Sequence, residues 1–169
     1  MWIDRIVALE KGQRCAAVKN VSLAEEHLHD HFPGMPIMPA PLIIEGMAQT
    51  AGILVGHARG FAEKVILAKI TRASFNGDVR PGQTLFYEAT LERIDDAGAS
   101  TSGLVSVVDH ADLFRQGLEA ESRRPLGSIQ LMFSHVDRNM AGLAFPEHNF
   151  VFTDQFFNLL RNSGFDPQA

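Results

Sequence analysis

Residues 31–54 read HFPGMPIMPAPLIIEGMAQTAGIL, and this stretch decides the fold of the chain. It begins as a proline-rich loop and continues, from Pro41, as an apolar run interrupted only by one acidic residue, one amide, one threonine and glycines. Proline suits the first turn of a helix, because its missing N–H would have no intrahelical acceptor there. Apolar residues fall on all sides of the run, so it predicts one long, buried helix over residues 41–58.

Two ionisable residues of this stretch are candidates for chemistry. Glu45 falls inside the apolar helix, and His31 precedes it by 14 residues, in the loop. A buried carboxylate is costly unless it is paired, hydrogen-bonded or protonated, and such groups concentrate at functional sites. Gln49 follows Glu45 by one turn on the same face, where its amide can reach the carboxyl group. These residues supply an acid/base pair, although they equally allow a structural polar pair in the core.

The rest of the chain is patterned mostly as strands. Apolar residues predict a hairpin that turns at Lys11-Gly12, and polar residues predict a turn over residues 95–102. Further strands are expected at residues 65–67, 85–91, 104–108 and 129–133. One long helix with several antiparallel strands makes an α+β domain.

Composition excludes several classes of function. A formal net charge of −5 without a basic run argues against nucleic acid as a partner. No apolar stretch is long enough to span a bilayer, and the N-terminus lacks the pattern of a signal peptide. The single cysteine, Cys15, excludes an intrachain disulfide. We expect it to be a small core residue of a cytoplasmic protein.

The loop and helix resemble the active-site motif of the 3-hydroxyacyl-[acyl-carrier-protein] dehydratases of the FabZ/FabA type. In that family HFPGxPxMPG leads into a central helix that carries an acidic residue and then AQ. The matching parts of this chain are HFPGMPIMPA, Glu45, Ala48-Gln49, WIDRIVALEKGQRCAAVKNVS (residues 2–22), Phe75 and RPGQ (residues 80–83). The resemblance covers about residues 1–110 and returns at 127–136. Glutamate followed by AQ resembles the FabZ branch, which only dehydrates; the FabA branch carries Asp and also isomerises the double bond.

The resemblance implies a hotdog fold, in which a curved antiparallel sheet wraps around the central helix. This domain would span residues 1–136, with an inserted segment at about 110–126. Residues 137–169 would then form a C-terminal extension, in which Thr153 caps a short helix over 154–162 that packs on the domain or the dimer. A lid over the acyl chain is the alternative role for this helix.

The resemblance also implies a reaction, the dehydration of an acyl-carrier-protein-linked 3-hydroxyacyl thioester to the trans-2-enoyl thioester in fatty acid or related lipid biosynthesis. His31 would take the proton from C2, and Glu45 would protonate or orient the leaving hydroxyl, with Gln49 orienting the carboxylate. The substrate-binding loop would comprise Phe32, Pro33, Gly34 and Pro41. This chemistry needs no cofactor. Family members form homodimers whose sites combine the histidine of one chain with the carboxylate of the other, and often trimers of dimers.

Two features depart from the family pattern. The family has glycine and then Val or Cys at the helix start, where backbone N–H groups polarise the thioester carbonyl, whereas this chain has Ala40-Pro41. Loss of one such donor typically costs about 10²–10³-fold in rate, unless the N–H of Ala40 serves alone. The segment RASFNGD, residues 72–78, lacks most of the basic charge of the family's KARFRRP, which would face an acidic carrier protein. A specialised carrier or a coenzyme A thioester is therefore an alternative substrate.

Other functions compete with this interpretation. His27, His29 and His31 alternate as zinc ligands on a strand would, but no cysteine or acidic cluster completes the set, so we expect no metal. The enzymatic alternatives are a coenzyme A-thioester hydratase or dehydratase and a hotdog thioester hydrolase. The non-enzymatic alternative is an acyl-thioester-binding subunit that pairs with an active homologue. Ala40-Pro41 favours this subunit, whereas His31 together with Glu45 favours the dehydratase.

Overall fold

The computed structural model describes residues 1–112, 123–136 and 146–167. Within them, six strands form one sheet in the order β1-β2-β4-β5-β6-β3, and all neighbouring strands are antiparallel. The strands are β1 (Arg5–Glu10), β2 (Arg14–Asn20), β3 (Val65–Phe75), β4 (Gln83–Ile94), β5 (Gly98–Asp109) and β6 (Arg124–His135). The helices are α1 (His27–Asp30), α2 (Ala40–Ala58) and α5 (Asp154–Asn162).

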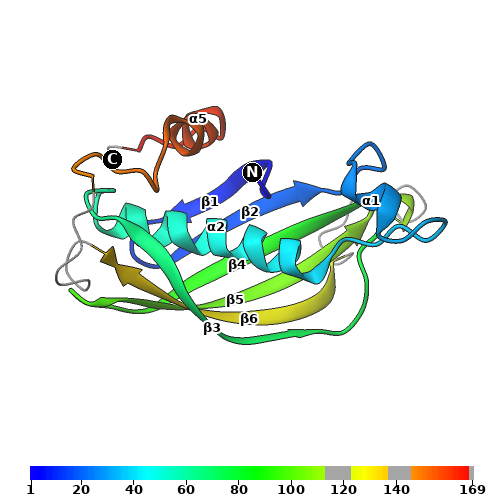
Figure 1. The fold of residues 1–169 in the computed structure, drawn as a ribbon, viewed down its shortest axis with the longest axis horizontal. Helices are drawn as coiled ribbons and strands as arrows, with labels where there is room; N and C mark the ends of the chain where they lie inside the picture. The colour runs from blue at the N-terminus through cyan, green and yellow to red at the C-terminus, as the bar shows by residue number, and fades with distance from the viewer. Residues whose placement is uncertain (113–122, 137–145, 168–169) are drawn as a thin grey trace.

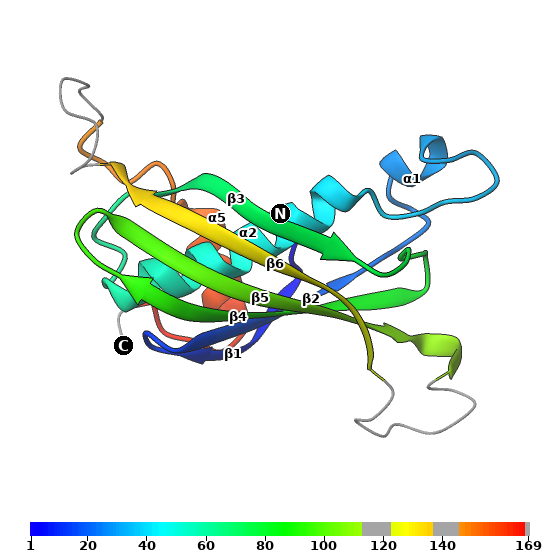
Figure 2. The ribbon, with the colours of Figure 1, turned by 90° about the horizontal axis from the view of Figure 1, so that it is seen from below.

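Helix α2 lies across one face of the sheet, and the sheet curves around it (Figure 1, Figure 2). In β4 the side chains of Leu85, Tyr87 and Ala89 are completely buried, whereas Phe86 is half-buried and Glu88 and Thr90 are exposed. Burial of every second side chain along a strand is expected when one face of the sheet is covered. The predicted α+β fold, a curved antiparallel sheet wrapped around a long central helix, is confirmed.

Two glycines let α2 approach the sheet closely. A β carbon added at Gly46 in α2 would lie 2.5 Å from Cζ of Tyr87. Gly103 in β5 lies equally tightly against the side chain of Met47. Because protein interiors are close-packed, a larger residue at either position would push the helix away from the sheet. The two glycines therefore set the depth at which α2 lies.

One stripe of α2 is not buried, so the prediction of a helix buried on all sides was wrong for the single chain. Pro41 and Glu45 are exposed, and Gln49 and Gly52 are half-buried. These four residues, which we call the α2 stripe, follow one another at helical spacing on one side. The pattern of apolar residues predicted burial but not which surface would cover each side of the helix.

The turn between β4 and β5 is shorter than the predicted turn over residues 95–102, because β5 begins at Gly98. The carboxylate of Asp95 accepts hydrogen bonds from the N–H groups of Ala97 at 2.9 Å and Gly98 at 3.2 Å. These bonds close the turn and hold the pKa of the Asp95 carboxyl below its usual value. The predicted hairpin at Lys11-Gly12 is confirmed, and Gly12 has the positive φ of 66° that this turn requires.

Helix α5 covers the edge of the sheet formed by β1. It spans Asp154–Asn162, the predicted range, and the hydroxyl of Ser163 at its end accepts the N–H of Ile6 at 3.0 Å. Thr153 occupies the N-cap position, but its side chain makes no capping hydrogen bond within the described residues. The helix lies toward the end of the molecule opposite α1 (Figure 1), so it does not cover the loop that carries His31.

The other edge of the sheet, formed by β3, is open in the described part of the chain. Every residue from 67 to 74 is exposed, and among them Leu67 is 37% and Ile70 is 45% exposed. Exposed strand edges present unpaired backbone groups and invite pairing with another strand. This β3 edge is therefore a natural place for a second chain.

Two sequence expectations reach beyond the described residues. Of the inserted segment at about 110–126, residues 113–122 lie outside them, and β6 already begins at Arg124. The division between a domain ending at residue 136 and an extension from 137 stays a prediction. No helix in the described part is long and apolar enough to cross a membrane.

A matched pair of substitutions in α2 tests the close packing. Gly46→Ala should lower the free energy of unfolding by about 1–3 kcal/mol, because its methyl group overlaps Tyr87. Gly52→Ala should be neutral or raise it by up to about 1 kcal/mol, since that methyl group would lie 3.7 Å from Phe133 and alanine favours the helix. Urea unfolding of both variants measures the difference, and equal effects would contradict the packing described.

Candidate active site

His31 begins the loop between α1 and α2, at one end of the molecule (Figure 1). Its Nδ1 lies 3.0 Å from the carbonyl oxygen of Ile37. A carbonyl oxygen can only accept, so Nδ1 carries the hydrogen and Nε2 of the neutral ring has a free lone pair. The loop thus presents His31 in the tautomer that a general base needs.

Backbone hydrogen bonds hold the loop in shape. The N–H of Ile37 donates to the carbonyl of His31 at 2.9 Å, and Phe32 and Met35 exchange N–H···O bonds of 3.1 and 2.9 Å. Gly34 lies at the tip of this turn with a φ of 75°, which glycine adopts without strain. The N–H of Met38 then donates to the carbonyl of Val79, which ties the loop to the chain after β3.

A hollow of about 500 Å³ lies beside the His31 ring. It is lined by His31, Phe32, Ile37, Met38, Ala40, Pro41, Ile43, Phe75, Gly77 and Asp78. The lining is mostly apolar, and the first turn of α2 forms part of its wall. N–H groups in the first turn of a helix have no intrahelical acceptor and favour negative charge, so Ala40 can donate here, while Pro41 cannot.

Glu45 and Gln49 form the second part of the predicted site. The side-chain amide of Gln49 donates to Oε1 of Glu45 at 2.9 Å, and its own Oε1 accepts the N–H of Trp2 at 2.9 Å. The predicted contact between the two side chains is confirmed. Glu45 is exposed, however, and does not line the hollow beside His31.

The structure therefore brings together only part of the predicted set. His31, Phe32, Ala40 and Pro41 share the hollow, whereas Pro33 and Gly34 are exposed and outside its lining. The expected burial of Glu45 is not found in the single chain.

The three alternating histidines do not converge. His27 and His29 belong to the short helix α1 rather than to a strand. The ring of His27 packs edge-on against Trp2, with centroids 5.3 Å apart, and Nε2 of His29 lies 2.9 Å from the carbonyl oxygen of Leu23. Each of the three rings thus has a separate neighbour.

Sequence reasoning missed Arg124, an exposed residue at the start of β6. A β carbon added at Gly77 would lie 3.4 Å from its guanidinium, so Arg124 stands beside the rim of the hollow. Its neighbour Arg123 lies over the ring of Phe86, 4.1 Å from the centroid. Both arginines lie near the end of the predicted insertion, far along the chain from Gly77, and only the short run RRP marked them in the sequence.

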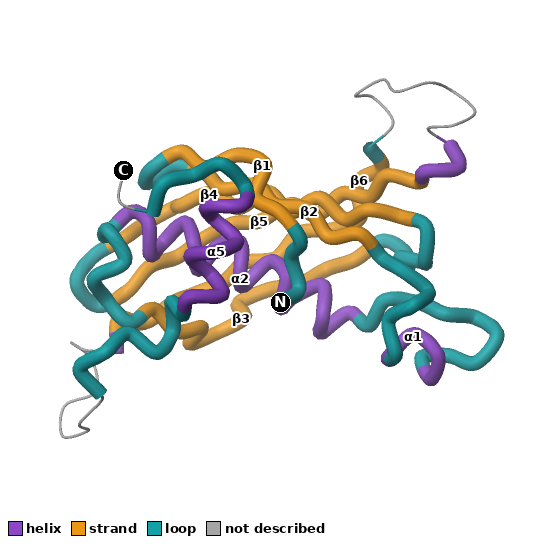
Figure 3. The backbone as a smooth tube through the Cα atoms, turned by 90° about the horizontal axis from the view of Figure 1, so that it is seen from above, coloured by secondary structure: helices purple, strands orange, loops and turns teal. Residues whose placement is uncertain are grey.

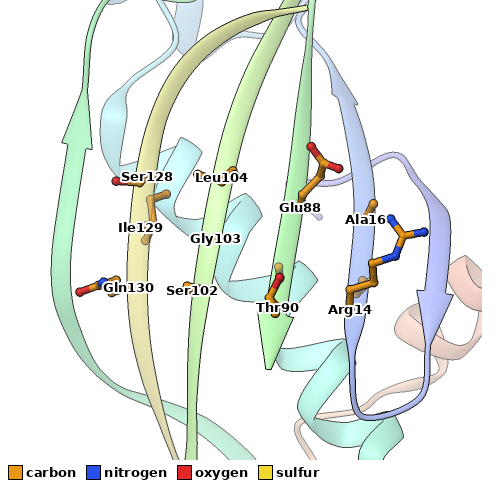
Figure 4. Close-up of a pocket in the computed structure, with 12 residues that line it drawn as sticks. Arg14, Ala16, Glu88, Thr90, Ser102, Gly103, Leu104, Ser128, Ile129 and Gln130 are labelled. Atoms are coloured by element: carbon orange, nitrogen blue, oxygen red, sulfur yellow. The ribbon is translucent and has the colours of Figure 1, made fainter. Parts of the chain in front are cut away.

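A second hollow, of about 430 Å³, lies on the face of the sheet away from α2 (Figure 4). Strands β2, β4, β5 and β6 line it with small and polar residues, among them Ala16, Thr90, Ser102 and Ser128. Its cation, Arg14, is paired with Glu10 at 2.7 Å. No predicted site residue and no histidine lines this hollow among the described residues, and its one carboxylate, Glu88, lies on the exposed face of β4.

Comparison with known proteins identifies relatives over most of the chain. A family model described as a FabA-like domain matches residues 1–113. The 3-hydroxyacyl-[acyl-carrier-protein] dehydratase FabZ of Caldanaerobacter subterraneus subsp. tengcongensis is 39% identical over 108 residues, which are 63% of this chain and 77% of that protein. FabZ of Fusobacterium nucleatum is 40% identical over 111 residues, covering 64% and 77%.

Solved structures agree on the fold. The dehydratase heterocomplex ApeI:P from Xenorhabdus doucetiae superposes with a TM-score of 0.53 at 14% identity, over 76% of this chain and 96% of that one. This likeness supports the hotdog fold that the motif implies. At 14% identity it carries no argument about function.

Cys15 is completely buried in β2, as predicted. Burial raises the pKa of its thiol to about 12, so the thiol stays protonated at neutral pH. We expect a thiol reagent at pH 8 to leave the native protein unmodified and to modify one cysteine per chain in denaturant. Rapid native modification would mean that the β2 region opens readily.

Proposed function

The chain belongs to the FabA-like family, and on this basis we propose that it dehydrates 3-hydroxyacyl thioesters of an acyl carrier protein to trans-2-enoyl thioesters. One observation carries the proposal within the structure: the Nδ1 of His31 donates to Ile37 beside an apolar hollow. A base with this geometry suits removal of a weakly acidic proton next to a thioester carbonyl.

The reaction divides among three groups of the chain. Nε2 of His31 takes the proton from C2, and the electron pair of the C–H bond forms the C2–C3 double bond as the C3–O bond breaks. The carboxyl group of Glu45 gives its proton to the departing hydroxyl, which leaves as water. The N–H of Ala40 donates to the thioester oxygen while negative charge develops there. Return of the proton from His31 to Glu45 through solvent resets the site.

We infer that a complete site combines two copies of the chain. Glu45 does not line the hollow beside His31 in its own chain, and the α2 stripe that carries it lies open. The β3 edge is also open and exposes apolar side chains. A two-fold dimer would pair this edge with its own copy and could bring Glu45 of the second chain to the hollow beside His31.

Arg124 supports an acidic partner. Acyl carrier proteins are acidic, and complementary charge at the rim of a site raises the rate of association. Segment 72–78 carries little positive charge, but Arg124 stands beside Gly77 at the rim. We therefore propose that the end of the insertion supplies the cation that contacts the carrier protein.

Single substitutions test the two catalytic roles. His31→Ala and Glu45→Gln should each lower turnover of a 3-hydroxyacyl-carrier-protein by about 10²–10⁴-fold, since each removes a proton-transfer group. Absorbance of the enoyl thioester measures the rate, and circular dichroism checks that both variants fold. A folded wild-type protein without turnover on short and long acyl chains, and on coenzyme A thioesters, would favour the binding-subunit alternative.

Mixing the two inactive variants tests the shared site. Co-expressed His31→Ala and Glu45→Gln chains form heterodimers in which one of the two sites is intact. Random pairing should therefore restore about a quarter of the wild-type activity. Each variant co-expressed with itself is the control, and no recovery in an established heterodimer would exclude sites shared between chains.

Charge reversal tests the carrier contact. Arg124→Glu should raise KM for the carrier-bound substrate by about 3- to 10-fold. The same substitution should make KM depend less on salt concentration. Lys11→Glu, in the β1–β2 turn at the other end of the molecule, is the matched control and should leave KM unchanged. A small thioester without the carrier should be turned over equally by all three proteins; if it is affected too, Arg124 acts on the site itself.

A further inference from the structure

The N-terminal segment contacts the helix that carries Glu45. The backbone N–H of Trp2 donates to Oε1 of Gln49 at 2.9 Å, and Nε2 of Gln49 donates to Oε1 of Glu45 at 2.9 Å. In Figure 1 and Figure 3 the N-terminus lies beside the middle of α2. The three residues thus form a short hydrogen-bonded chain from the backbone to the carboxylate.

Chemistry fixes the direction of this chain. A side-chain amide can be turned around so that its oxygen and nitrogen exchange places. The N–H of Trp2 can only donate, so the oxygen of Gln49 must face it and the NH₂ group must face Glu45. In the reversed orientation two donors would face each other and an oxygen would face the carboxylate, so both hydrogen bonds would be lost.

Trp2 is itself held firmly in place. The next residue, Ile3, is 2% exposed in the core, and the N–H of Asp4 donates to the carbonyl of Val18 at 2.8 Å. The indole ring of Trp2 packs edge-on against His27. His27 is in α1, the helix that ends directly before His31.

We propose that Trp2 is a positioning residue for the acid/base pair: its backbone N–H sets the orientation of Gln49 and thereby the hydrogen bond to Glu45. Its ring contacts His27 in α1, the helix that ends directly before His31. This inference rests on the proposed function for its effect on rate, but the orientation of the amide can be measured without it.

Proline and alanine at position 2 both remove the indole ring. Proline also removes the backbone N–H donor, whereas alanine keeps it. All variants carry the same short N-terminal tag, so that Met1 is retained. We expect Trp2→Pro to lower kcat by about 3- to 10-fold relative to Trp2→Ala, with KM unchanged, which corresponds to one net hydrogen bond. Trp2→Phe, which keeps both ring and N–H, should retain wild-type kcat. Equal kcat values for the proline and alanine variants would overturn the proposal.

A double-mutant cycle separates positioning from a general structural effect. In a Gln49→Leu background, the proline and alanine variants should have the same kcat, because the N–H of Trp2 acts only through the amide. If the difference persists in that background, Trp2 acts by another route and the proposal fails.

Nuclear magnetic resonance gives a readout that does not depend on activity. The side-chain NH₂ signals of Gln49 should be the same in wild type and Trp2→Ala, and should shift and exchange faster with solvent in Trp2→Pro. A wild-type protein without turnover would refute the proposed function, while these signals would still decide the orientation. Unchanged signals in Trp2→Pro would refute the positioning role.

Discussion

Tyr87 lies so close to Gly46 in α2 that no β carbon fits between them, and the positions of the proposed functional groups depend on this contact. A helix is stiff, so fixing its depth in the middle also fixes its first turn, where Ala40 borders the hollow beside His31. Glu45, the residue before Gly46, lies about a quarter of a turn away from this contact and is exposed. A bulkier residue at position 46 would therefore disturb the site as well as the core.

Backbone groups orient two of the proposed functional residues, His31 and Gln49. A carbonyl oxygen, that of Ile37, selects the tautomer of His31, and an N–H group, that of Trp2, selects the orientation of Gln49. A carbonyl oxygen can only accept a hydrogen bond and an N–H group can only donate one. Each therefore allows its partner side chain a single tautomer or amide orientation. Substitution elsewhere in the loop can change side chains without changing these roles, as long as the backbone keeps its path.

The sequence was informative where a pattern is local. Pro41 and the apolar run predicted α2 to within one residue, and spacing alone indicated that the amide of Gln49 can reach Glu45, which it does. It was uninformative where the outcome depends on residues far apart in the chain. Neither the exposure of Glu45 nor the approach of Arg124 to Gly77 has a local signature, because each depends on how the sheet and the helix are assembled. Residues 98–102 belong to β5 but were predicted as part of a turn. Their small side chains, mostly hydroxyl-bearing, do not show the alternation of apolar and polar residues by which a strand is recognised.

The covering of β1 by α5 has a consequence for how large an assembly can grow. A sheet with two open edges can add chains at both sides and extend into a ribbon without limit. At the β1 edge of this sheet the hydroxyl of Ser163 accepts the N–H of Ile6. The β3 edge is therefore the edge at which a further strand can pair. In the proposed dimer two chains join through their β3 edges and neither edge stays open. The C-terminal helix would then act as a terminator that stops growth of the sheet at a pair.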